Sequence, residues 1–173
     1  ASDITGDGRV DISAESFSRV PSMHGTVSAN ARVALAGYVA DRLDLKATLA
    51  AGGPAQVDAK LFAYGASATA SGTVSLPDGD APVRFDIRGR AQRVNLGALP
   101  RALGAPRAAT DLNAAYHVVG SQPMAGKGVQ RLTLDATMAR STVPGARFEG
   151  GGTAQLNVVG TAIAYRVDAT VAE

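Results

Sequence analysis

The chain has 173 residues, of which 46% are hydrophobic and 18% are charged; this is the composition of one globular domain, without the ~20-residue apolar run of a membrane helix. The net charge of +2 lacks the basic surplus of most nucleic-acid or anionic-membrane binders. The absence of cysteine and tryptophan, with only 5% aromatic residues, excludes disulfides, zinc–thiolate sites, cysteine nucleophiles and a base-stacking platform.

A period-two alternation of apolar or small residues with polar residues runs through the chain. Alternation of this kind places one set of side chains on each face of a β-strand. In chain order it predicts strands at Arg9–Ala14, Thr26–Ala36, Arg42–Ala51, Ala55–Tyr64, Ala66–Leu76, Pro82–Gln92, Thr110–Val119, Val129–Ser141, Ala146–Val159 and Ala162–Ala172. Gly, Pro and Asp between these segments predict short turns. We therefore expect an all-β chain built as an antiparallel meander.

One segment interrupts the alternation. Leu96, Leu99 and Leu103 recur at helical spacing, and Gly104 offers a C-terminal cap. Residues 95–104 are therefore predicted to form a short helix or structured loop across the end of the sheet, with Pro100 in the first turn. The strand unit recurs at a loose spacing, so we expect 1–173 to be one β-rich domain and a segment of a longer repetitive sheet.

The start of the chain has the spacing of a calcium-binding loop. Asp3, Asp7 and Asp11 would supply oxygens, and Gly8 the sharp turn. The final carboxylate position is Ala14, and the flanking residues alternate like strands, so ordinary turn and strand chemistry of Asp and Gly is the favoured interpretation. Weak calcium binding remains an alternative.

Other motifs give no support for catalysis. His24, in a Met-His-Gly turn, and His117, on the polar phase of a strand, lack the spacing of a metal site and are expected to face solvent. No Gly-x-Ser-x-Gly elbow occurs, and residues 126–128 (Gly-Lys-Gly) are too short for a phosphate loop. We therefore expect no enzymatic activity, catalytic residue, metal or cofactor.

The densest basic cluster is Arg84, Arg88, Arg90 and Arg93, of which all but Arg93 share one face of a strand. The favoured interpretation is that these side chains keep an exposed sheet face or edge in water. The alternative is contact with lipid headgroups or an acidic partner.

The apolar phase carries enough hydrophobic side chains that something must cover it, because burial of each is worth ~1.5–3 kcal/mol. A second sheet, the same sheet folded over, or a hydrophobic ligand would serve. Interleaved alanines such as Ala29, Ala59 and Ala136 leave a closed core short of volume and leave space for an acyl chain, although alanine is abundant on every face. The candidate groove-lining residues are Val33, Leu35, Leu43, Leu45, Val74, Leu76, Val83, Phe85, Ile87, Leu112, Tyr116, Val118, Leu132, Leu134, Met138, Leu156, Val158, Ile163, Tyr165 and Val167.

Residues 83–99 (VRFDIRGRAQRVNLGAL) and 111–120 (DLNAAYHVVG) show alternating strands that end in glycine, separated by a leucine-spaced segment; 132–139 and 155–160 repeat the pattern. This pattern resembles the TamB and AsmA-like proteins of Gram-negative bacteria. The resemblance implies a long sheet curled into an elongated half-pipe (β-taco), hydrophobic inside and polar outside. It also implies a periplasmic location, with the parent protein anchored in the inner membrane.

The function that the resemblance implies is movement of phospholipids between the inner and outer membranes, or support of outer-membrane assembly. The partners would be phospholipid acyl chains and, through parts of the parent chain, an outer-membrane β-barrel assembly protein. A non-enzymatic lipid-conducting segment is thus the leading hypothesis. A structural or interaction module with a closed, dry core, either a β-sandwich or a β-solenoid, is the second, and a calcium-binding module the third.

Overall fold

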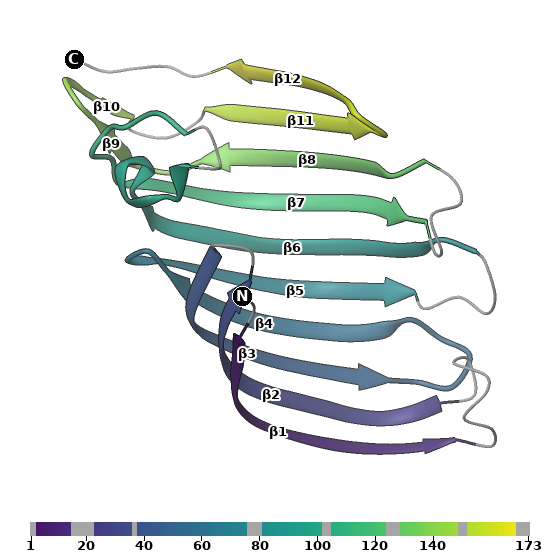
Figure 1. The fold of residues 1–173 in the computed structure, drawn as a ribbon. Helices are drawn as coiled ribbons and strands as arrows, with labels where there is room; N and C mark the ends of the chain where they lie inside the picture. Colours follow the sequence, from purple (N-terminus) through teal and green to yellow (C-terminus); the bar gives the residue numbers. More distant parts are fainter. Residues whose placement is uncertain are drawn as a thin grey trace.

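The computed structural model describes residues 3–14, 23–35, 38–75, 81–101, 105–123, 129–148 and 152–168. The strands are β1 (Asp3–Ala14), β2 (Met23–Leu35), β3 (Tyr38–Leu49), β4 (Ala55–Ala63), β5 (Ala66–Ser75), β6 (Val83–Val94), β7 (Leu112–Gln122), β8 (Arg131–Met138), β9 (Ser141–Val143), β10 (Ala146–Phe148), β11 (Thr153–Val159) and β12 (Ala162–Asp168). Ten of them form one antiparallel sheet in the order β1-β2-β3-β4-β5-β6-β7-β8-β11-β12, and β9 and β10 form a separate two-stranded hairpin (Figure 1). The predicted all-β antiparallel meander is confirmed.

The single strand predicted at Ala146–Val159 is wrong. The chain turns back at Pro144 and Gly145, so that Ala146 pairs with Val143, and β11 begins only at Thr153. Gly145 has a φ of 82°, which glycine adopts without steric cost and which suits a tight hairpin turn.

Some other boundaries also differ. β7 continues through Gly120 to Gln122, where the sequence predicts a turn, and His24 lies inside β2 instead of in a turn. The predicted turn after Leu76, the Gly-Lys-Gly turn at 126–128 and the last residues of the predicted final strand lie outside the described residues.

A short helix or structured loop is predicted at 95–104. The described residues form a 3-10 turn of three residues, η2 (Leu96–Ala98), with Leu99 extended after it, and residues 102–104 lie outside the described residues. The Asn95 side chain accepts a hydrogen bond from the N–H of Gly97 at 3.0 Å and so caps this turn. Leu99 is extended, with ψ of 151°, because the residue before a proline is driven out of the helical region, and Pro100 has no N–H to continue the turn.

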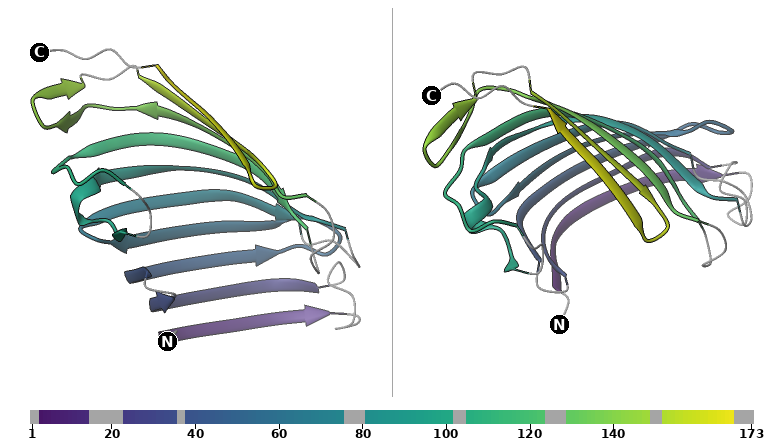
Figure 2. Two further views of the ribbon diagram at one scale, coloured as in Figure 1. Left: turned by 45° about the horizontal axis from the view of Figure 1, so that its top comes forward. Right: turned by 90° about the horizontal axis from the view of Figure 1, so that it is seen from above.

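The sheet is bowed along its strands and is not closed into a barrel (Figure 2). Register shifts occur in β2 between Ala31 and Val33, and between β6 and β7 near Arg93. Such bulges bend a strand and increase its twist. Arg93 has a φ of 57°, and its N–H donates to Oδ1 of Asn113 at 2.9 Å.

No helix among the described residues is long and apolar enough to cross a membrane.

A small polar network joins the β6 bulge to the β9–β10 hairpin. Ser141 is the most buried side chain, at 2% exposure. Its Oγ accepts a hydrogen bond from the N–H of Asn113 at 2.8 Å and donates to the carbonyl of Ala139 at 2.8 Å. The Asn113 side chain also donates to the carbonyl of Arg140 at 2.9 Å. This network holds the hairpin against the start of β7.

Substituting Ser141 by alanine removes the acceptor of the Asn113 N–H. Leaving a buried amide unpaired costs about 1–3 kcal/mol, so we expect S141A to lower the free energy of unfolding by that amount in urea titrations. The neighbouring Thr142 has an exposed side chain, so T142A should change the free energy of unfolding by less than about 0.5 kcal/mol. Equal losses in the two variants would contradict the role assigned to Ser141.

Candidate functional site

One face of the ten-stranded sheet is apolar from edge to edge. Residues opposite each other in an antiparallel sheet share a face, so the register can be followed across all the strands. One such line of partners, which we call the central row, is Gly8, Ala29, Leu45, Ala59, Ala70, Gly89, Tyr116, Ala136, Ala154 and Val167. A parallel line contains Val10, Val27, Ala47, Val57, Gly72, Ile87, Val118, Leu134, Leu156 and Tyr165. We call this surface the apolar face and the opposite surface the polar face.

The structure brings the candidate groove-lining residues together on the apolar face. Two of the twenty cannot be placed: Leu76 lies outside the described residues, and Leu35 is described only as part of the β2 backbone. The register puts the other eighteen on one face, namely Val33, Leu43, Leu45, Val74, Val83, Phe85, Ile87, Leu112, Tyr116, Val118, Leu132, Leu134, Met138, Leu156, Val158, Ile163, Tyr165 and Val167.

The apolar face is not packed into a core. Among the described residues, Ala55 is the only buried hydrophobic residue, whereas Ile4 and Tyr165 near the two edges of the sheet are 68% and 80% exposed. The total accessible surface is 11149 Å², against about 7,900 Å² expected for a compact monomer of this mass. The described strands therefore do not supply the second layer that a closed β-sandwich requires.

Two aromatic rings on this face lie over glycines of the neighbouring strand. A Cβ built on Gly120 would come within 2.5 Å of the Phe85 ring, and one built on Gly89 within 2.6 Å of Cζ of Tyr116. The pairs are reciprocal, since Phe85 (β6) covers a glycine of β7 and Tyr116 (β7) covers a glycine of β6. An aromatic ring that covers a cross-strand glycine stays close to the sheet, so neither ring projects far from the apolar face.

Tyr116 is further fixed by its hydroxyl, which donates to the backbone carbonyl of Thr69 at 2.8 Å. The ring thus reaches across Gly89 from β7 to β5. Partial burial disfavours the charged phenolate and raises the pKa of Tyr116 above the ordinary tyrosine value. Sequence patterning places Gly89 and Gly120 on the apolar phase but cannot reveal these pairs, because they depend on the register of β6 against β7.

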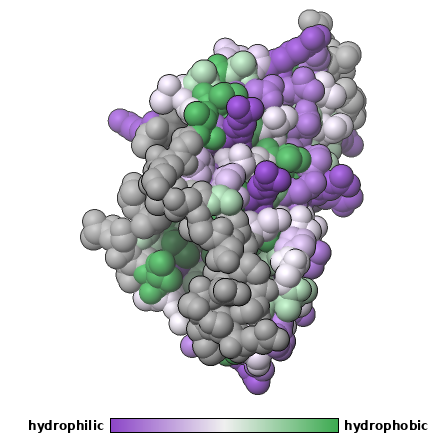
Figure 3. All heavy atoms as spheres, turned by 90° about the vertical axis from the view of Figure 1, so that its right-hand side faces the viewer, coloured by the Kyte–Doolittle hydropathy of each residue, from purple (hydrophilic) through white to green (hydrophobic). Residues whose placement is uncertain are grey.

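The polar face carries the charged side chains, as the alternation predicts. Figure 3 shows hydrophilic residues gathered along one margin of the molecule. Arg84, Arg88 and Arg90 share the polar face of β6 as expected, and His117 lies beside them with Nε2 at 2.7 Å from Oδ1 of Asp86. Arg93 is set apart by the bulge.

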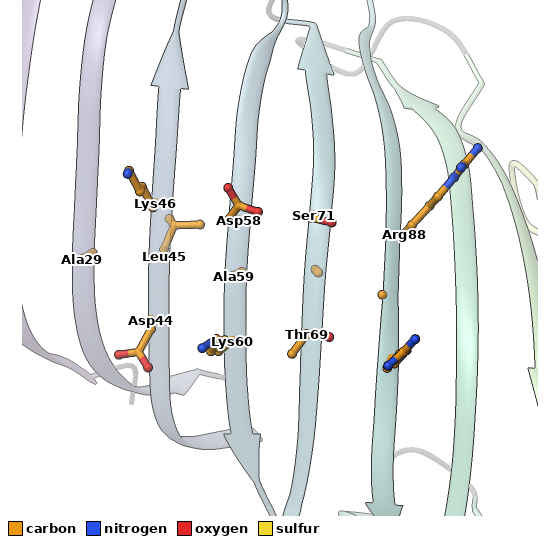
Figure 4. A pocket seen from close by; sticks show the side chains of 13 residues that line it. Ala29, Asp44, Leu45, Lys46, Asp58, Ala59, Lys60, Thr69, Ser71 and Arg88 are labelled. Carbon is orange, nitrogen blue, oxygen red and sulfur yellow. The ribbon is translucent and has the colours of Figure 1, made fainter. Parts of the chain in front are cut away.

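The polar face is hollowed over β2 to β6, with a volume of about 710 Å³ (Figure 4). Its lining consists of Ala29, Leu45, Ala59, Ala70 and Gly89 of the central row, together with Asp44, Lys46, Asp58, Lys60, Thr69, Ser71, Arg88 and Arg90. Each of these polar residues comes directly before or after a central-row residue in its strand. Because successive side chains of a strand point to opposite faces, the polar side chains stand on the polar face. The hollow, which we call the polar trough, therefore runs between two lines of polar side chains over the backbone of the central row. Sequence patterning did not predict it.

The calcium-loop interpretation does not describe the start of the chain. Residues Asp3–Ala14 form an extended strand paired with β2 along its whole length. Asp7 and Asp11 are four residues apart on that strand, about 13 Å, too far to share one ion. Among the described residues, no group of three His, Asp or Glu side chains could hold a metal ion.

Comparison with known proteins adds no relative: no protein-family model, no curated protein and no solved structure matches the chain.

The raised pKa of Tyr116 can be measured by ultraviolet difference titration of the native chain against Y116F. We expect the tyrosine lost in Y116F to titrate above about pH 10, the value of an unfolded tyrosine. The stability contributed by the neutral, partly buried phenol is present below that pH and is lost as the pH rises through the folded pKa. A midpoint at or below 10 would contradict the packing of this ring.

Proposed function

We propose that the chain is a non-enzymatic lipid-binding and lipid-conducting segment whose apolar face holds phospholipid acyl chains. The proposal depends on one observation, the continuous apolar face that the described strands leave uncovered. In this proposal the bowed sheet is a half-pipe with the apolar face inside. The parent protein is a periplasmic, membrane-anchored protein of the TamB or AsmA-like type, with an outer-membrane barrel assembly protein as a partner of other parts of that chain.

The free energy of the apolar face supports a hydrophobic ligand. Each half-covered Leu, Ile or Val side chain gains on the order of 1 kcal/mol when the rest of its surface leaves water. An acyl chain loses about 0.8 kcal/mol per methylene exposed to water. Contact between the two therefore removes both surfaces from water. The acyl chain can slide across the strands along the central row, because every position in that row is apolar or glycine.

The two edges of the sheet support the idea of a segment. β1 and β12 each pair on one side only. Their apolar-face positions, which include Ile4, Val10, Ile163 and Tyr165, carry no charge, and neither strand contains proline. Isolated sheets usually protect their edge strands with inward-pointing charges or proline, and β1 and β12 lack both on the apolar face. Further strands on both edges would continue the apolar face.

Photocrosslinkers placed on neighbouring residues can test which face meets lipid. We expect a label at Phe85, Ile87 or Leu134 to capture phospholipid from vesicles, and the same label at Arg84 or Asp135 to capture none. Leu134 and Asp135 are adjacent in β8 but on opposite faces, so the pair controls for position along the sheet. Equal capture from both faces, or no capture with lipid present, would falsify the proposal.

A charge on the apolar face should block lipid binding without unfolding the sheet. Leu134 faces Val118 and Leu156 across the neighbouring strands, and an aspartate there would have to be desolvated beneath an acyl chain. We expect L134D to bind lipid at least about tenfold more weakly, a loss of about 1.4 kcal/mol, with an unchanged circular dichroism spectrum.

The matched control is T133D, which adds the same charge on the polar face and should bind lipid normally. If L134D unfolds while T133D does not, the apolar face is a sealed core and the closed-core module is the better description.

A further inference from the structure

The two ends of the polar trough differ in charge. Across β3 and β4, Asp44 stands opposite Lys60, and Lys46 opposite Asp58, so opposite charges balance. Across β5 and β6, Thr69 stands opposite Arg90, and Ser71 opposite Arg88, so two cations face two neutral hydroxyls. The β6 end is therefore the electropositive end of the trough.

The carboxylates nearest to these two arginines are not paired with them. On the β7 side, Arg90 stands opposite Ala115 and Arg88 opposite His117. The nearest carboxylate on β6, Asp86, is engaged by His117 Nε2 at 2.7 Å. Within the described part of the chain, neither the Arg88 nor the Arg90 side chain makes a hydrogen bond or an ion pair.

The spacing of these groups suits a tetrahedral oxyanion. Arg88 and Arg90 flank Gly89, and their backbone positions are about 6.6 Å apart along the strand. Figure 4 shows the Arg88 side chain directed toward β7, so this flexible side chain must turn back over Gly89 to meet one anion together with Arg90. Each guanidinium presents a planar fork of N–H donors that matches phosphate oxygens. The hydroxyls of Thr69 and Ser71 add donors from the next strand.

We propose that the β6 end of the polar trough binds a phosphate group, held by Arg88 and Arg90 with Thr69 and Ser71 beside them. The site is on the face opposite to the lipid-binding face and stands independently of the proposed function. The phosphate can belong to a soluble phosphomonoester or to a lipid headgroup at a membrane surface, and the experiment separates these sources.

The test for soluble phosphate is a titration of the chain with glycerol 3-phosphate at constant ionic strength, followed by NMR of the arginine side-chain N–H groups. We expect saturable shifts at Arg88 and Arg90 and none at Arg166, which is paired with Asp168 at 2.7 Å. R88Q or R90Q should weaken binding at least about tenfold, as expected for loss of a charge-assisted hydrogen bond, and the double variant should abolish it.

The matched control is K46Q, which removes the same charge from the opposite end of the same trough. It should bind glycerol 3-phosphate like the native chain. All of these residues are exposed, and thermal unfolding of each variant checks that the fold is retained.

The second arm uses sedimentation with vesicles of phosphatidylglycerol or of phosphatidylcholine. Loss of binding to phosphatidylglycerol vesicles in the double arginine variant but not in K46Q identifies the headgroup as the source, whereas binding of glycerol 3-phosphate alone identifies a soluble ligand. The proposal is overturned if the double variant binds both probes like the native chain, if K46Q weakens binding as much as R88Q, or if neither probe binds the native chain.

Discussion

The structure depends on a single constraint: an antiparallel sheet with one predominantly apolar face and no second layer among its described strands. Hydrogen bonding between strands satisfies the backbone, but it does nothing for the side chains of Ile87, Leu134 or Leu156. The hydrophobic contribution to stability therefore comes mainly from contacts within one surface, which removes far less area from water than a core does. Any apolar partner that covers this face removes it from water and thereby lowers the free energy.

The shape of the apolar face follows from side-chain size along the central row. Most of its members are glycine or alanine. Its one aromatic residue, Tyr116, is held over Gly89 by a hydrogen bond to the carbonyl of Thr69. Phe85 lies over Gly120 in the same manner. A row without tall side chains contributes little to packing against a second sheet, because interdigitation needs volume on both sides. It is a better partner for a thin, flexible ligand that must move across many strands.

Much of the fold follows from local pattern, because the period of two is repeated in nearly every strand and its phase decides the face of every residue. The eighteen described groove-lining candidates share a face for this reason. The errors fall where non-local or backbone-specific effects decide. Gly145 turns one predicted strand into a hairpin, and β7 runs through Gly120, where the glycine predicts a turn. The aromatic–glycine pairs and the polar trough depend on register between strands, which local alternation does not specify.

The two faces of the sheet are linked through the same backbone. The small residues of the central row keep the centre of the apolar face low. The backbone of the same row forms the floor of the polar trough. This is because a strand residue whose side chain points to one face leaves a gap on the other face, between the side chains of the residues before and after it. Long polar side chains on either side of that gap, such as Arg88 and Arg90 about Gly89, then form walls. The alternation that makes one face suitable for lipid thus sets the spacing of charges on the other. A substitution that bends the backbone at Gly89 acts on both surfaces, whereas one at Arg88 or Leu134 acts on only one.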